Sequence, residues 1–245
     1  MNKWNSSLIS EIFLQKQKEK SEDRDNLLRL VSRSLYGEAV HYALELIQNA
    51  EDENSSIIKF IFDKGQAIVI NDGRPFDEDD VWGICSVKTG KKIRKIGFFG
   101  IGFKAVFNVT KNPQIISGDF NFELSDFIYP APLMTIPKIA RKEYSPKKGA
   151  IFSLPYCPEL ASPGTLIENF SLIDEKLLLF LENLQKLSFE DLINGNRWEI
   201  QKQLEASESF TIAGHEVRYS TVSLVNSLTG DTNLVSPVRL GSFSS

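Results

Sequence analysis

The fold is decided by a short glycine-rich run, IGFFGIGFK at residues 96–104. Glycines let the backbone come close to an anion, and the helix predicted over residues 103–109 would point its N–H groups and positive end at that anion. Lys104 would add a positive charge. The run lacks the Gly-Lys-Ser/Thr ending of a P-loop, and it does not directly follow a strand as a dinucleotide fingerprint does. Taken alone it is a weak signal for a phosphate site, and the polar segment before it, residues 86–95, predicts a mobile lid.

A second pattern lies upstream, in an amphipathic helix predicted over about residues 38–52. Glu45 and Asn49 share one face of this helix because they are four residues apart, and Asp52 lies one further turn along. A carboxylate beside a carboxamide can activate a water molecule and offer an oxygen ligand to Mg²⁺. Such pairs are also common on solvated helix faces, which is the alternative interpretation when the helix is taken alone.

A third pattern is an apolar strand that delivers an acid to a glycine turn, IVINDG at residues 68–73. A buried carboxylate at Asp72 can accept a hydrogen bond from an exocyclic amine such as that of adenine. The alternative is a plain turn, because Asn, Asp and Gly favour turns in any case.

The three patterns, in this order, resemble the GHKL ATPase superfamily with its Bergerat fold. The run 96–107 is similar to the phosphate loop of the ninety-kilodalton heat-shock chaperones, and residues 45–52 are similar to their Mg²⁺ helix. Residues 46–52, 71–76 and 177–184 resemble the sacsin-type and NO VEIN-type domains of this superfamily more closely. The resemblance covers roughly residues 25–225.

The resemblance implies a role for each matching residue. Glu45 would be the general base, and Asn49 would bind Mg²⁺. Asp72 would accept the adenine amine, with Asn71 as the alternative if the turn is offset by one. The remaining nucleotide contacts that the resemblance implies are Asp52, Gly73, Lys88, Gly97, Phe99, Gly100, Ile101, Gly102, Phe103 and Lys104.

Two positions depart from the superfamily pattern. The Asp-x-Gly-x-Gly box reads NDGRP at residues 71–75, so its second glycine is missing and the placement of adenine is less certain. The Gly-Thr whose hydroxyl assists the adenine acid corresponds to Gly149-Ala150. Without that hydroxyl, one adenine contact passes through water or is lost.

The composition fits a globular domain and disfavours some classes of function. The chain has 245 residues, of which 42% are apolar and 17 are Phe, enough for a substantial core. A net charge of −4 gives no bulk basic field for nucleic acid, and no apolar run is long enough for a membrane span. Cys85 and Cys157 have no metal-like spacing, so we expect reduced thiols in a cytoplasmic protein.

The expected fold is an α/β two-layer sandwich, a mixed and mostly antiparallel sheet covered on one face by helices. We expect an N-terminal helical extension over 1–24, the ATP-binding domain over 25–225, and a polar, loop-like tail over 226–245. Periodicity and turn residues predict further elements: a helix over 21–37, a hairpin of 57–63 and 66–70, a short helix over 77–84 capped at Asp77, short strands between 114 and 154, a long amphipathic helix over 171–192, and strands between 197 and 225.

The function expected from the resemblance is Mg²⁺-dependent binding and slow hydrolysis of ATP, acting as a conformational switch. No obvious Arg or Lys completes a γ-phosphate site, and the resemblance implies that a following domain of a longer protein supplies one. Self-association on ATP binding is the other partner expected. The altered adenine box and Ala150 motivate the alternative, a nucleotide sensor or interaction module without hydrolysis. An intact Glu45 argues against that alternative.

Overall fold

The computed structural model describes residues 3–18, 40–86, 102–138, 148–170, 172–173, 175–212, 215–228 and 231–243. The predicted helix over 21–37 and nearly all of the predicted lid and glycine loop, from Val87 to Ile101, lie outside these ranges. Within them, no helix has both the length and the apolar character needed to cross a membrane.

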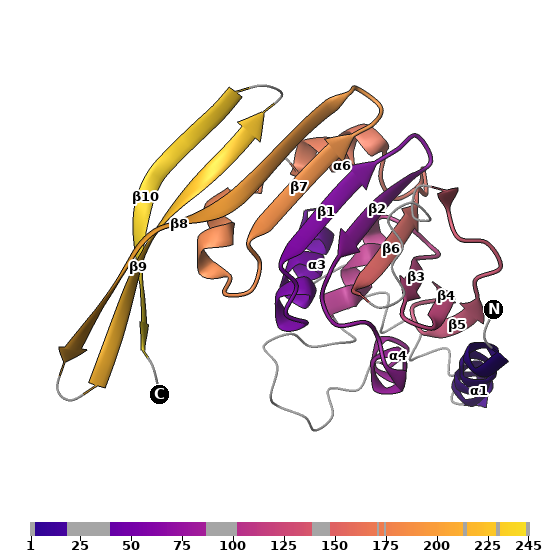
Figure 1. Cartoon of the computed structure of the whole chain (residues 1–245). Coiled ribbons are helices and arrows are strands. Elements are labelled where there is room, and N and C mark those ends of the chain that lie inside the picture. Colours follow the sequence, from indigo (N-terminus) through magenta and orange to yellow (C-terminus); the bar gives the residue numbers. More distant parts are fainter. Residues whose placement is uncertain are drawn as a thin grey trace.

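Ten strands form one sheet in the order β10-β9-β8-β7-β1-β2-β6-β3-β4-β5 (Figure 1). In chain order they are β1 (Ile57–Phe62), β2 (Gln66–Asn71), β3 (Gln114–Ser117), β4 (Phe120–Ser125), β5 (Tyr129–Pro132), β6 (Ala150–Pro155), β7 (Lys186–Asp191), β8 (Asn196–Ile212), β9 (His215–Leu228) and β10 (Asp231–Phe243). β1 pairs in parallel with β7, whereas the other pairings between these described strands are antiparallel. The predicted mixed and mostly antiparallel sheet is therefore confirmed.

Helices cover one face of this sheet. Figure 1 shows α3 (His41–Asp52) and α6 (Pro163–Phe170) on the same side of the strands. The apolar stripe of α3 includes Leu46, which is fully buried in one large core together with Phe60 of β1 and Val69 of β2. Full burial of a side chain the size of leucine contributes about 1.5–3 kcal/mol, so this interface fixes α3 on the sheet. The two-layer prediction is confirmed.

Three further helices pack around the sheet and α3. The 3₁₀ helix η1 (Gly102–Asn108) packs against α3, in the place where a helix opening from the glycine run was predicted. The helix α4 (Glu78–Ile84) begins at Asp77, whose side chain accepts from the backbone N–H of Asp80 while the Asp80 side chain accepts in return. This capping box confirms the predicted cap. The first helix, α1 (Lys3–Lys18), packs against β5.

The long helix predicted over 171–192 is wrong. After α6 the chain forms only a short 3₁₀ helix, η2 (Glu175–Phe180), and then the strand β7. The carboxylate of Glu51 accepts hydrogen bonds from the backbone N–H groups of Glu182, Asn183 and Leu184, which holds this segment as an irregular turn. The apolar residues that suggested a helical stripe are divided between η2 and a central strand, because sheet pairing overrides local periodicity.

The tail predicted to be loop-like is also wrong. Residues 231–243 form the edge strand β10, which pairs along β9. Its register shifts between Val235 and Val238, on either side of Pro237. Proline cannot donate to a ladder and is tolerated at edge strands and bulges, so this sequence suits an edge although it lacks a strongly apolar strand pattern. The strands β9 and β10 carry the sheet past residue 225.

Candidate functional site

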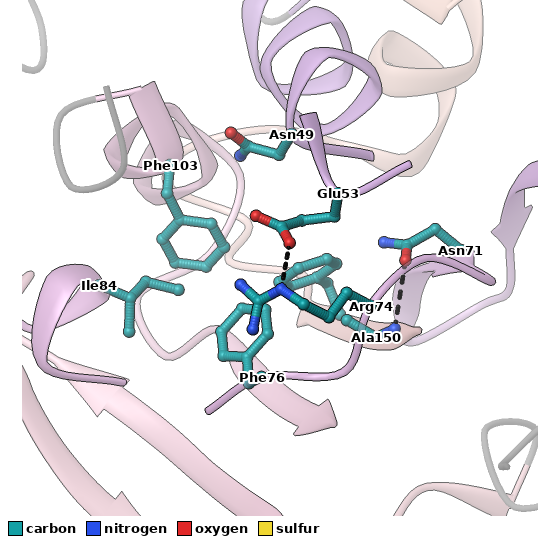
Figure 2. A pocket seen from close by; sticks show the side chains of 9 residues that line it. Asn49, Glu53, Asn71, Arg74, Phe76, Ile84, Phe103 and Ala150 are labelled. Atoms are coloured by element: carbon teal, nitrogen blue, oxygen red, sulfur yellow. Dashed lines mark hydrogen bonds and ion pairs between the residues drawn. The ribbon is translucent and has the colours of Figure 1, made fainter. Parts of the chain in front are cut away.

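A pocket opens where the C-terminal end of α3, the end of β2 and the start of β6 meet η1 and α4. Polar side chains approach it from α3 and β2, and apolar side chains form the facing wall (Figure 2). The residues that line it are Asn49, Glu53, Asn71, Arg74, Phe76, Ile84, Phe103, Ala150 and Phe152. An apolar cleft with a few convergent polar groups is the usual form of a small-molecule site.

One face of α3 leads into this pocket. Asn49 is only 8% exposed and lines the pocket, and Glu45 lies one helical turn before it. The Glu45 carboxylate lies directly against Gly102, where an added Cβ would come within 2.0 Å of Oε2. Burial raises the pKa of Glu45, although nearby His41 lowers it in part. The structure thus brings the first and second sequence patterns together and places the Glu45 carboxylate one helical turn from the pocket residue Asn49.

Asn71, the last residue of β2, lines the pocket and is 8% exposed. Its Oδ1 accepts hydrogen bonds from the backbone N–H groups of Gly73 at 3.3 Å and Ala150 at 3.2 Å. Gly149 makes this arrangement possible: its φ is +65°, and a Cβ there would come within 1.8 Å of the Asn71 carbonyl oxygen. The Gly-Ala pair recognised in the sequence therefore lies against the end of β2.

Asp72 lies on the other side of the strand end and does not line the pocket. Its carboxylate accepts from Ser56 N at 2.8 Å, Ser56 Oγ at 2.6 Å and Ile57 N at 2.8 Å. Burial alone would raise the pKa of Asp72, but these hydrogen bonds outweigh it and lower the pKa. The carboxylate holds the start of β1, and the residue that faces the pocket is Asn71, the alternative left open by the sequence.

Lys104 is also placed differently from the prediction. Its side chain is 3% exposed, and Nζ donates to the carbonyl oxygens of Ile84 and Phe127. Burial lowers the pKa of Lys104 to about 8, with Cys85 opposing that shift in part. The ammonium group thus ties η1 to the end of α4 and to the turn before β5, instead of pointing at a phosphate.

The remaining predicted residues fall into three groups. Phe103 lines the pocket, and Gly73 lies beside it, where a Cβ would come within 2.4 Å of Ser55 Oγ. Asp52 lines a separate groove that also contains Gln48 and Leu177. Outside the described residues lie Lys88, Gly97, Phe99, Gly100 and Ile101.

Sequence reasoning missed the two charged residues that line the pocket, Glu53 and Arg74. Glu53 is 7% exposed and pairs with Nε of Arg74 at 2.7 Å. The two terminal nitrogens of Arg74 reach Asp77 at 2.9 Å and Asp80 at 2.8 Å, so the guanidinium joins α3 to α4. The signal for Glu53 was its spacing, four residues after Asn49 and eight after Glu45, which continues one helix face better than Asp52 does.

Comparison with known proteins agrees with this geometry. The family model described as "Sacsin domain" matches residues 64–130. Protein NO VEIN of Arabidopsis thaliana is 27% identical over 206 residues, which cover 72% of this chain and 7% of that protein. Sacsin of Homo sapiens is 36% identical over 95 residues, which cover 31% of this chain and 2% of that protein. The chain therefore spans only a small fraction of either relative.

The solved structure of the N-terminal domain of a DNA repair protein aligns with a TM-score of 0.51 over 80% of this chain and 70% of that one. The identity in that alignment is 11%, so the likeness shows the fold alone. The chain is therefore similar in sequence to Sacsin and Protein NO VEIN, as the resemblance predicted, and it shares the fold of this N-terminal domain of a DNA repair protein.

Proposed function

We propose that this domain binds ATP with Mg²⁺ and hydrolyses it slowly, as a conformational switch within a longer protein. The observation that carries the proposal is the contact between Glu45 and Gly102 beside the pocket that holds Asn49 and Asn71. It brings a proton acceptor and Gly102 of the glycine run next to a small pocket with polar and apolar walls, although these segments are far apart in the sequence.

The residues present fit a hydrated Mg²⁺ ion. The carboxamide of Asn49 offers a neutral oxygen at the pocket, and the Glu45 carboxylate lies one turn away. Mg²⁺ usually keeps several waters and takes one or two protein ligands together with substrate phosphates. One amide oxygen from the protein is therefore enough for such a site. Bound there, Mg²⁺ would neutralise charge on the phosphate oxygens.

Hydrolysis places one demand on Glu45. A general base must be ionised to accept a proton from the attacking water, and it works best when its pKa lies nearer the working pH. Burial raises the pKa of Glu45 in this direction. Gly102 leaves room for the carboxylate because any side chain there would overlap Oε2. Phe103, the next residue, forms part of the apolar wall on which a purine would rest.

The second candidate is a nucleotide-binding module that does not hydrolyse. One observation favours it: Arg74, the cation among the residues that line the pocket, is engaged with Glu53, Asp77 and Asp80. Lys104 is buried against carbonyl oxygens. Neither described cation is therefore available for a γ-phosphate, and turnover would depend on a group from a downstream domain or from a second copy.

Calorimetric titration separates these candidates from a domain that binds no nucleotide. ATP, ADP and a non-hydrolysable ATP analogue are titrated with and without Mg²⁺, and phosphate release is followed in parallel. The proposal expects saturable binding of ATP that weakens when Mg²⁺ is removed, with slow phosphate release. Binding without any phosphate release supports the second candidate, whereas no heat of binding under any condition overturns both.

A further inference from the structure

The orientation of the Asn71 carboxamide is fixed by its neighbours. Two backbone N–H groups, those of Gly73 and Ala150, point at the same end of the side chain at 3.3 and 3.2 Å. A backbone N–H can only donate, so the end that it meets must be the oxygen. The Ser55 hydroxyl also donates to Oδ1, at 3.4 Å. Turning the amide over would set an NH₂ group against two N–H donors, so the orientation follows from the hydrogen bonds.

The other end of the amide consequently presents a donor. Figure 2 shows Nδ2 of Asn71 on the side of Glu53, while Oδ1 points to Ala150. Within the described part of the chain, Nδ2 donates to no other group. Glu53 contributes a carboxylate that is 7% exposed and lines the same pocket. The pocket therefore offers a purine one fixed donor and one acceptor.

A donor at this position changes which base can be read. The amine of adenine donates and its neighbouring ring nitrogen accepts, whereas guanine has an accepting carbonyl and a donating ring N–H in the same places. A carboxylate at the position of Asn71 would oppose the guanine carbonyl, and an unpaired polar group costs about 1–3 kcal/mol. The Asn71 amide can instead donate to the adenine ring nitrogen or to the guanine carbonyl, and Glu53 can accept from either purine.

We propose that Asn71 removes the usual discrimination at this site, so that 6-amino and 6-oxo purine nucleotides bind with comparable affinity. The inference rests on the proposed nucleotide site and specifies the class of ligand that it takes. It also fits a domain that keeps its glycine run and Glu45 but carries Asn71, not an acid, at the end of β2.

Competition for a fluorescent ATP analogue tests the inference. ATP, GTP and ITP compete with the analogue, in the presence of Mg²⁺, on wild type and on Asn71→Asp. The wild-type affinities should agree within about threefold. Asn71→Asp keeps an acceptor for Gly73 and Ala150 but replaces Nδ2 with an oxygen. It should favour ATP over GTP and ITP by about tenfold, the ratio that corresponds to about 1.4 kcal/mol.

Asp72→Asn is the matched control because its carboxylate faces Ser56 and Ile57. It should leave the ratio of ATP to GTP affinity unchanged. A wild-type preference for ATP above tenfold overturns the inference and leaves nucleotide binding intact. An unchanged ratio in a folded Asn71→Asp variant also overturns it. If none of the nucleotides displaces the analogue, or the analogue itself does not bind, the proposed function fails as well.

Discussion

At the scale of single residues, Glu45 is the side chain whose removal separates binding from chemistry. Glu45→Gln keeps the shape and the contact with Gly102 but cannot accept the proton of the attacking water. We expect nucleotide affinity within about threefold of wild type and a loss of turnover of about 10²-fold or more, the usual contribution of a general base. Titration calorimetry and phosphate release measure the two effects. An equal loss of affinity and turnover would contradict the assigned role.

The raised pKa of Glu45 predicts how turnover depends on pH. Burial raises the pKa of Glu45, and the ionised form is the active base. Turnover should therefore decline, as the pH is lowered, at a higher pH than for an exposed glutamate, whose pKa is about 4.3. The pH profile of kcat provides the measurement. A kcat that stays constant down to that value would show that Glu45 is not titrating in the rate-determining step.

A variant of Lys104 tests whether this lysine stabilises the fold or binds phosphate. In Lys104→Met the apolar stem remains but the hydrogen bonds to Ile84 and Phe127 are lost. Nucleotide affinity should stay within about twofold. Burial lowers the pKa of Lys104 to about 8, below about 10.4 for an unfolded lysine. Between these values the unfolded chain holds a proton that the native chain has lost, so wild-type stability rises with pH there.

Chemical denaturation of wild type and Lys104→Met between pH 7.5 and pH 10 measures that slope. The contribution of Lys104 should disappear in the variant. A tenfold or larger loss of ATP affinity in a folded Lys104→Met variant would instead show that this lysine binds the phosphates.

Single residues also show which parts of the site could be predicted from the sequence and which could not. Glu45 and Asn49 were paired from their spacing and Gly102 was assigned from the resemblance, and the structure places Glu45 against Gly102 and one helical turn from Asn49. The sequence favoured Asp72 over Asn71 and left Asn71 as the alternative, because side chains alternate across a strand and a shift of one position reverses the face. Asn71 faces the pocket and Asp72 faces Ser56. An Asn-Asp pair at a strand end does not reveal in the sequence which member points inward.

At the scale of elements, the junction of β2 and β6 positions the pocket. Gly149→Ala would combine a φ of +65° with a Cβ placed 1.8 Å from the Asn71 carbonyl oxygen. Gly195 provides a control, because its φ is +79° and nothing lies within 4 Å of an added Cβ. The left-handed conformation alone costs about 1–2 kcal/mol, so Gly195→Ala should lose about that much stability and Gly149→Ala clearly more. Urea denaturation measures both, and equal losses would mean that the close approach is not important.

Elements built from local contacts were predicted well and those built from distant pairing were not. The hairpin of β1 and β2 and the helix α3 follow from turn residues and periodicity within a few residues. The strand β7 depends on pairing with β1, more than a hundred residues earlier in the chain, and β10 depends on β9. Local patterns do not encode such partners, so a leucine-rich run resembled a helix and a polar edge strand resembled a loop.

At the scale of the whole molecule, the chain corresponds to a small part of Protein NO VEIN and of Sacsin. The matched regions cover 7% of Protein NO VEIN and 2% of Sacsin. If the proposed switch operates, it would act through the face formed by α3 and η1. The predicted lid over 86–95 adjoins that face in sequence and lies almost entirely outside the described residues, so its closure remains a prediction.

Hydrogen exchange followed by mass spectrometry, with and without Mg²⁺ and ATP, tests the central claim most directly, because it reports both binding and its location. The account predicts added protection in peptides that cover residues 45–53, 71–76 and 102–108, and in the lid segment if it closes. Peptides that cover residues 177–183, which line a separate groove with the other face of α3, should exchange at the same rate in both states. Unchanged exchange at the first three segments, or protection confined to residues 177–183, would contradict the account.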